Sequence, residues 1–266
     1  MSKDMSIFVA THKKFDMFKT DIYEPIQVGC ALNSTRFGYL VDNIEDNISS
    51  KNRNYCELTA LYWIWKNNNS KIKGLCHYRR YLSLKDINTS SKFFINKEVI
   101  ENDLRNYDLI IPKKRVLKRI TCRENYLLGQ GIEKDLDNLQ KIIKKVCPEY
   151  EESYEKILNG NICSYCNVMI AKAEVFDSYC KWLFEILFEL EKITDLTGYT
   201  YQEARVYGYL SELLLNVWID KNNLKYKEYS LINTEIKKDA KYYVKFCLEK
   251  FNMYKFIREK KDSLYR

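Results

Sequence analysis

A cluster of basic and aromatic residues follows an apolar run in this 266-residue chain. The run Ile72–Cys76 leads directly into His77, Tyr78, Arg79 and Arg80. Two guanidinium groups can hold a diphosphate through paired hydrogen bonds, and a neighbouring tyrosine can stack or donate a hydrogen bond. Ligands of open α/β sheets bind beyond the carboxyl ends of the strands. The cluster therefore predicts an anion-binding site, and an exposed basic strand end is the alternative.

A second cluster lies at the start of an expected helix. Asn54 and Glu57 have the spacing of a capping box, in which each side chain satisfies a backbone N–H of the first turn. Lys51, Asn52 and Glu57 also suit an anion or the hydroxyl groups of a ligand, because the N-terminus of a helix carries a partial positive charge. Both interpretations can hold together.

A third cluster lies in the expected helix 202–220. One stripe of this helix is apolar, and a separate stripe carries Arg205, Gly208, Glu212 and Asn216. A glycine inside a helix costs roughly 1 kcal/mol relative to alanine. We therefore expect Gly208 to allow another group to approach this face closely, and an ordinary Arg–Glu contact on a solvated face is the alternative.

The elements that must position these clusters alternate along the chain. Apolar runs of strand length occur at 7–10, 72–78, 109–112 and 167–171, and helical periodicity occurs at 55–66, 135–146, 174–193, 202–220 and 237–260. This alternation predicts an α/β fold. Neither GxGxxG nor GxxxxGK[ST] is present, so any phosphate must be held partly by side chains.

The positive charge is concentrated at the C-terminal end. Residues 237–266 contain ten Lys/Arg and four Asp/Glu, and they account for six of the eight net positive charges. We expect residues 1–236 to form one domain and residues 237–266 to form a basic amphipathic helix that lies on an anionic membrane surface. A docked helix with a solvated outer face is the alternative. The 22 tyrosines are spread over the chain without a nucleic-acid-binding motif, so we expect no nucleic acid partner.

Cysteine usage and hydropathy favour a cytoplasmic protein. The basic helix expected at 237–266 would attach it peripherally to the inner face of the cell membrane. No stretch approaches the roughly 18 apolar residues of a membrane-spanning helix, and the N-terminus lacks the pattern of a secretory signal. The nine cysteines are odd in number and scattered. Cys163 and Cys166 form a single CxxC, which we interpret as core or turn cysteine rather than a zinc site. Asp135 and Asp137 resemble a metal-binding Asp-x-Asp pair, but they start a helical stretch and are better explained as its N-terminal acids.

Taken together, the segments resemble a family of bacterial capsular-polysaccharide glycosyltransferases that has long been catalogued as a domain of unknown function. The resemblance runs from residue 7 to about residue 219 and rests on Ala10–Lys13, Ile26–Gly29, Asp46–Ser49, Lys51–Asn52, Tyr55–Trp63, Gly74–Tyr81, Asn167–Ile170 and Arg205–Glu212.

This resemblance implies that a sugar is transferred from a UDP-sugar donor to a surface glycan or a lipid-linked saccharide, with galactofuranose among the sugars that the family transfers. The implied fold is a GT-A-like single α/β domain with a Rossmann-like nucleotide-binding sheet. We expect the donor to be bound by Thr11, His12, Lys51, Asn52, Glu57, His77, Tyr78, Arg79, Arg80 and Arg205.

In many such enzymes an Asp-x-Asp pair at the end of the comparable strand holds a divalent metal. Here that strand ends in arginines, so we expect metal-independent donor binding with no cofactor. Inversion at the anomeric carbon would need a carboxylate base. Glu212 is the first candidate and Asp195 the second.

The chain departs from the family pattern at one position, where a histidine expected shortly after Tyr126 is replaced by Gln130 or Gly129. This change leaves the donor or acceptor specificity open. The alternative function is a non-catalytic protein that binds anions or an anionic membrane surface.

Overall fold

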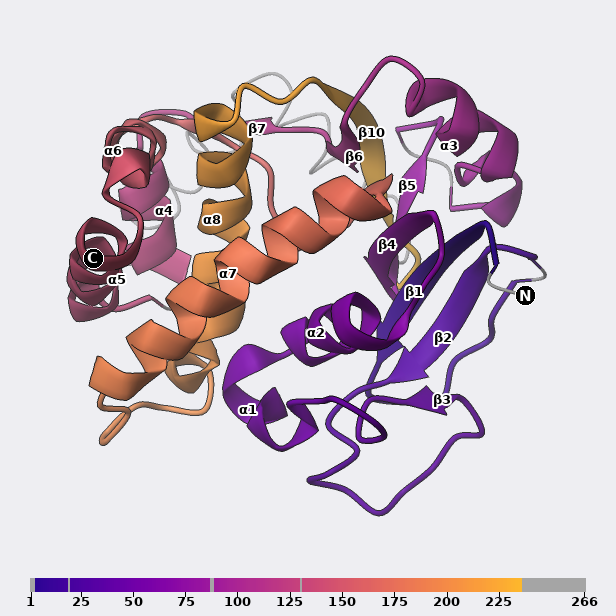
Figure 1. Ribbon diagram of the computed structural model, residues 1–266, viewed down its shortest axis with the longest axis horizontal. Coiled ribbons are helices and arrows are strands. Elements are labelled where there is room, and N and C mark those ends of the chain that lie inside the picture. Colours follow the sequence, from indigo (N-terminus) through magenta and orange to yellow (C-terminus); the bar gives the residue numbers. More distant parts are fainter. Residues whose placement is uncertain (1–2, 19, 87–88, 130, 236–266) are drawn as a thin grey trace, which may run out of the picture. The chain divides into compact units, whose positions relative to one another are not determined.

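The computed structural model describes residues 3–18, 20–86, 89–129 and 131–235, and the described residues up to Ile232 form one compact unit (Figure 1). The basic helix expected at 237–266 lies outside the described residues. The strands are β1 (Met5–Thr11), β2 (Tyr23–Gln27), β3 (Leu40–Val41), β4 (Ile72–His77), β5 (Arg80–Ser83), β6 (Leu109–Pro112), β7 (Arg115–Val116), β8 (Ile162–Cys163), β9 (Met169–Lys172) and β10 (Tyr226–Asn233). The helices are α1 (Asn52–Tyr55), α2 (Leu58–Asn67), α3 (Lys97–Asp103), α4 (Cys122–Gly129), α5 (Glu133–Val146), α6 (Glu151–Asn159), α7 (Ala173–Ile193) and α8 (Val206–Lys221).

The main sheet begins with four parallel strands in the order β3, β2, β1 and β4. The chain moves from β1 outward to β2 and β3, and then returns to place β4 on the other side of β1. The strand order therefore reverses between β1 and β4, which is where ligands bind in sheets of this kind. Antiparallel β9 joins β4 to β6, and β10 pairs parallel with β6. The predicted α/β fold is confirmed as a sheet with flanking helices.

Both faces of the sheet are covered, because alternate side chains of β1 enter different hydrophobic clusters. Phe8 and Ala10 belong to the cluster that includes α2, α7 and α8. Ile7 and Val9 belong to the opposite cluster, which includes residues of α3. In Figure 1, α2 and the long helix α7 lie together across one face of the sheet. A strand buried on both faces has few orientations open to it, so the end of β1 is held firmly.

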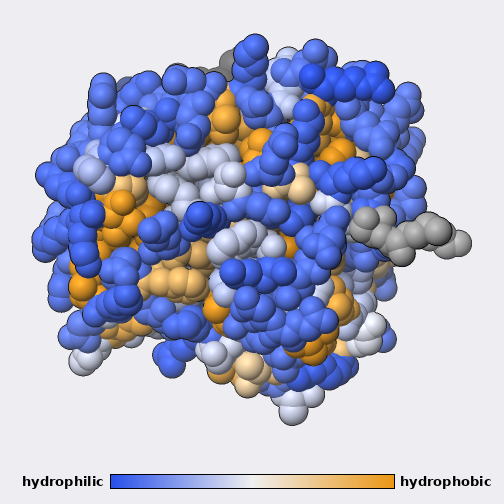
Figure 2. Space-filling view, in the orientation of Figure 1, coloured by the Kyte–Doolittle hydropathy of each residue, from blue (hydrophilic) through white to orange (hydrophobic). Residues whose placement is uncertain are grey.

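The surface in Figure 2 is mostly hydrophilic, with apolar residues in separate patches. Among the described residues, no helix is long and apolar enough to cross a membrane.

The helix expected at 55–66 is interrupted, and the predicted capping box is wrong. Cys56 has a φ of 53°, which ends α1 before α2 begins at Leu58. Asn54 lies inside α1 and donates a hydrogen bond to the carbonyl of Ala204 at 2.6 Å. No side chain caps α2 at Glu57. Tertiary contacts thus replace the local cap.

The helix expected at 202–220 starts as a 3₁₀ turn and becomes α8 at Val206. It is buried on nearly all sides rather than on one stripe. A Cβ atom at Gly208 would lie 3.2 Å from Sγ of Cys56. The close approach expected at this glycine therefore occurs, and the neighbour is the end of α1.

The fully buried carboxylate of Asp42 ties the loops after β2 and β3 to α2. Its oxygens accept hydrogen bonds from the N–H groups of Gly29 and Cys30 at 2.8 and 3.0 Å. They also accept from the hydroxyls of Ser49 and Thr59 at 2.5 and 2.6 Å. Thr59 in turn accepts from Asn52 at 3.0 Å, so the network reaches α1.

We expect Asp42→Ala to lower the free energy of unfolding by at least about 3 kcal/mol, because each buried donor left without a partner costs about 1–3 kcal/mol. Asp42→Asn keeps part of the acceptor capacity and should lose less. Urea denaturation measures both, with Asp21→Ala, an exposed aspartate, as the control expected to change stability by less than about 0.5 kcal/mol. Equal stabilities for Asp42→Ala and the control would contradict the role of this network.

Candidate functional site

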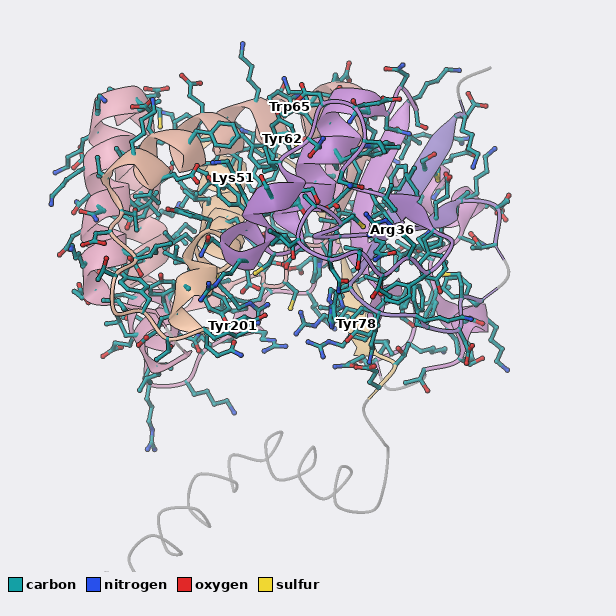
Figure 3. The ribbon with its side chains drawn as sticks, turned by 90° about the horizontal axis from the view of Figure 1, so that it is seen from below. Arg36, Lys51, Tyr62, Trp65, Tyr78 and Tyr201 are labelled. Atoms are coloured by element: carbon teal, nitrogen blue, oxygen red, sulfur yellow. The ribbon has the colours of Figure 1, made fainter. Side chains whose placement is uncertain are left out.

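A pocket of about 320 Å³ opens at the carboxyl ends of β1 and β4, where the strand order reverses. In Figure 3, Tyr78 and Tyr201 lie on the same side of the molecule, and nitrogen-bearing side chains gather between them. Seven of the residues expected to bind the donor line the pocket: Thr11, His12, Asn52, Glu57, His77, Arg79 and Arg205. The other lining residues are Ala10, Val28, Arg53, Cys56 and Tyr201.

The pocket is cationic, because three arginines face it against the single carboxylate of Glu57. Arg205 is fixed by its neighbours: its Nε lies 3.1 Å from Sγ of Cys56, and its guanidinium lies 5.4 Å from the ring centre of Tyr209. Planar guanidinium groups held in place can donate paired hydrogen bonds to the oxygens of a phosphate, so they favour a multiply charged anion such as diphosphate.

His77 is neutral at physiological pH. Burial and the positive charges of Arg80 and Arg79 lower its pKa to about 3. Its Nδ1 atom is buried and has no hydrogen-bond partner among the described residues. A neutral imidazole can both donate and accept a hydrogen bond. His77 therefore offers the pocket a polar contact without a further positive charge.

Cys56 sits at the base of the pocket in a backbone conformation that non-glycine residues adopt only when their surroundings impose it. Burial, with the charge of Glu57, raises the pKa of its thiol to about 11. The thiol is therefore protonated at neutral pH and is a poor nucleophile.

Three of the expected donor-binding residues lie elsewhere. Lys51 forms an ion pair with Glu191 of α7 at 2.6 Å, and so belongs to the contact between α1 and α7 (Figure 3). The ring of Tyr78 is buried and packs against His12 and His77, with centroid distances of 5.4 and 4.4 Å. Tyr78 thus supports the pocket wall instead of lining it.

Arg79 and Arg80 do not act as a pair, contrary to the sequence-based expectation. The chain turns sharply between β4 and β5, so that His77 pairs with Arg80. Arg79 lines the cationic pocket and Arg80 does not, but the charge of Arg80 acts on His77 of that pocket as well as on Glu212 and Cys166. Only Arg79 of the two therefore stands where it can contact a ligand in the cationic pocket.

Glu212 lines a second pocket of about 190 Å³, together with Cys122, Asn125, Tyr126, Gly129, Gly131, Tyr165, Tyr209 and Leu213. Burial, followed by the negative charge of Glu57, raises the pKa of Glu212 to about 7. The charges of Arg80 and Arg115 and the N–H of Cys166 oppose this shift. Such a carboxyl group can take up or release a proton near neutral pH.

Glu57 is held by Asn167, whose amide donates to it at 2.9 Å. The same amide group also donates to the carbonyl of Gly208 in α8 at 3.0 Å. Glu57 thus lines the cationic pocket beside α8, whereas Glu212 lies on α8 and lines the second pocket, and the two carboxylates are close enough for Glu57 to raise the pKa of Glu212.

Asp195, the second candidate for a base, lies in the exposed loop after α7 and lines neither pocket. Its carboxylate accepts a hydrogen bond from the N–H of Thr197 at 2.9 Å, which lowers its pKa.

Asp135 lies in the first turn of α5, as expected, and accepts a hydrogen bond from Tyr199 at 2.7 Å. Within the part of the chain that the structure describes, no three His, Cys, Asp or Glu residues are grouped as metal ligands.

Sequence reasoning missed Arg53, Cys56 and Tyr201 as pocket residues and missed the second pocket entirely. Arg53 is next to the expected ligand Asn52, so its position was a signal that could have been used. The second pocket combines α4, the loop before β9 and α8, and no local pattern connects these segments. Of the two residues at which a histidine was expected, Gln130 lies outside the described residues, whereas Gly129 lines this pocket.

Comparison with known proteins gives one family and one solved structure. The sequence matches the family described as a domain of unknown function (DUF4422) over residues 6–223. The fold is similar to the apo structure of WbbM, a bifunctional glycosyltransferase, with a TM-score of 0.80 and 30% sequence identity. The match covers 88% of this chain and 46% of the WbbM chain, so this chain spans about half the length of that protein. No curated protein matches the sequence.

We expect inorganic pyrophosphate to bind in the cationic pocket and Arg79→Gln to weaken that binding about 10- to 100-fold, because a charge-assisted hydrogen bond contributes about 1.5–3 kcal/mol. Lys51→Gln, which removes a positive charge outside the pocket, should leave the affinity within about threefold of wild type. Isothermal titration calorimetry gives both values. Equal weakening by the two substitutions would mean that pyrophosphate responds only to net charge.

Proposed function

This chain belongs to the DUF4422 family, and we propose that it is a glycosyltransferase that moves a sugar from a UDP-sugar donor to a glycan acceptor. The observation that carries the proposal is the cationic pocket at the point where the strand order reverses, with a carboxyl group of nearly neutral pKa beside it. The likeness to WbbM supports the same reaction class.

In the proposed reaction, Arg79 and Arg205 hold the diphosphate of the donor, and His77 donates a hydrogen bond to it. The hydroxyl oxygen of the acceptor attacks the anomeric carbon while the bond from that carbon to the phosphate oxygen breaks. The electron pair leaves with UDP, whose charge the arginines stabilise. The proton of the hydroxyl passes to the carboxylate of Glu212. A single displacement of this kind inverts the anomeric carbon.

We further propose that donor binding needs no metal ion. The pocket presents three arginines and one carboxylate, which together attract a diphosphate and repel a divalent cation. This choice of side chains suits an anion whose charge is balanced by the protein itself.

The remaining parts of the proposal concern the biological setting. By its resemblance to the capsular-polysaccharide family, the domain is GT-A-like, the transferred sugar is galactofuranose or another hexose, and the product is a surface polysaccharide. The acceptor is then a lipid-linked saccharide, and the protein works in the cytoplasm at the inner face of the membrane, with residues 237–266 as a membrane contact.

We expect purified protein to release UDP from one member of a panel of UDP-sugars that includes UDP-galactofuranose, and to do so equally in the presence of EDTA. Arg79→Ala should reduce turnover at least about tenfold, since a charge-assisted contact to the diphosphate is lost. Arg105→Ala, which changes an exposed arginine away from the pocket, is the control. Folded protein that neither binds UDP nor turns over any donor would refute the proposed function, and loss of turnover in EDTA alone would refute only its metal independence.

The pH profile gives an independent test of Glu212. A general base acts in its ionised form, so kcat/KM should rise about tenfold per pH unit below pH 7 and level off above it. Glu57→Gln removes the neighbouring negative charge and should move the midpoint of this rise to lower pH, whatever its effect on the maximal rate.

Glu212→Gln should lose about 10²- to 10⁴-fold in kcat with UDP affinity retained. Glu98→Gln, which changes an exposed residue of α3, is the control expected to keep both the rate and the profile. A profile that stays the same in Glu57→Gln would show that another group titrates.

A further inference from the structure

The second pocket carries a set of side chains that the donor does not use. Tyr126, Tyr165 and Tyr209 line it together with Asn125 and Glu212. Tyrosine combines a broad apolar face with a hydroxyl group, and a sugar ring likewise presents apolar C–H faces with hydroxyls at its rim. The volume of about 190 Å³ is below the roughly 300–1,000 Å³ of pockets for drug-sized ligands. A pocket of this size suits one sugar ring.

The two pockets are adjacent through α8. Arg205 lines the cationic pocket, and its guanidinium lies 5.4 Å from the ring centre of Tyr209, which lines the second pocket. The carboxylates of Glu57 and Glu212 are close enough for one to raise the pKa of the other. A hydroxyl held against Glu212 would therefore face the region where the donor sugar leaves the diphosphate.

A basic ribbon, residues 113–119, comes close to the second pocket at Arg115, which lies beside the pocket residue Tyr165. It contains Lys113, Lys114, Arg115, Lys118 and Arg119 and no acidic residue. In the two-stranded antiparallel sheet of β7 and β8, Arg115 pairs with Cys163, and its guanidinium lies 5.9 Å from the ring centre of Tyr165.

The charge of Arg115 also reaches Glu212. Lys113, Arg115, Lys118 and Arg119 are exposed, so these cations can meet an anionic group from solvent.

We propose that the second pocket is the acceptor subsite and that it takes a sugar whose reducing end carries a phosphate or diphosphate. The sugar ring lies against the tyrosines with one hydroxyl on Glu212, and the phosphate lies on the basic ribbon. This inference rests on the proposed transferase function and adds the place where the acceptor binds and the charged group by which it is recognised. The phosphate can belong to a soluble sugar phosphate or to a lipid carrier, since both present the same group to the ribbon.

The test uses pairs of synthetic acceptors that carry the same hexose, one on an uncharged octyl chain and one on octyl diphosphate, with a soluble hexose 1-phosphate as the third arm. For wild type, we expect the KM of the octyl diphosphate acceptor to be at least about tenfold lower than that of the octyl glycoside. Similar KM values for the diphosphate and the soluble phosphate would assign recognition to the phosphate alone. A lower value for the octyl diphosphate would assign part of it to the lipid.

Two variants separate the parts of the proposal. Lys118→Ser with Arg119→Ser should remove the preference for the charged acceptor and leave the KM of the octyl glycoside unchanged. Lys141→Ser with Lys181→Ser removes the same charge from exposed positions on α5 and α7 and is the matched control.

The pocket itself is tested at Gly129, where an added Cβ atom would meet no neighbouring atom within 4 Å. Gly129→Phe should fill the pocket and raise the KM of every acceptor, whereas Gly129→Ala should change it little. The affinity for UDP, measured without acceptor, should stay at the wild-type value in all four variants.

The proposal is overturned if Gly129→Phe leaves every acceptor KM unchanged, or if the ribbon variant keeps the preference for the charged acceptor. It is also overturned if Gly129→Phe is folded but loses UDP binding as well, because the second pocket would then belong to the donor. The absence of UDP release from any donor in wild type would instead be a failure of the transferase function.

Discussion

The buried carboxylate of Asp42 is the constraint on which the cationic pocket depends. Burying a charge costs several kcal/mol unless hydrogen bonds replace the lost water. Asp42 has four such bonds, all from neutral donors, and these donors come from the loop after β2, from the turn before α1 and from α2. The carboxylate is stable only when these three segments meet around it. Because Thr59 also accepts a bond from Asn52, the meeting point fixes the pocket wall that carries Asn52, Cys56 and Glu57.

Helix α8 and the residue before it contribute side chains to both pockets. Arg205 at its N-terminal end serves the cationic pocket, and Glu212 serves the tyrosine-lined pocket. Seven residues separate them, which corresponds to about 10 Å along a helix. In the proposed reaction this spacing leaves room for the transferred sugar between the diphosphate and the base. Gly208 allows this close approach, because a Cβ atom there would lie 3.2 Å from Sγ of Cys56, which also contacts Arg205, and the neighbouring atoms would have to shift by a few tenths of an ångström.

The sequence predicted the parts of this site that depend on local patterns. Continuous apolar runs predicted the buried strands β4 and β6, and the polar residues after Cys76 therefore had to lie at a strand end, beside those after Ala10. The break at Cys56 had no such signal, since the helical period continues through it. The bonds to Asp42 and the contact with α8 impose that break, and both come from residues distant in the chain. The split between Arg79 and Arg80 depends on where β4 ends, and an uncertainty of one residue reverses which arginine faces the pocket.

This split has an electrostatic consequence that a pair of arginines on the diphosphate would not have. Burial and Glu57 both favour the protonated form of Glu212, and without opposition its carboxyl group would remain a poor base at neutral pH. Arg80 and Arg115 oppose them from β5 and β7 and lower the pKa towards 7. Arg79 remains in the cationic pocket for the leaving group. One sharp turn therefore gives each half of the proposed reaction its own cation: Arg79 stabilises the negative charge that leaves, and Arg80 keeps the base close to the pH at which it can accept a proton.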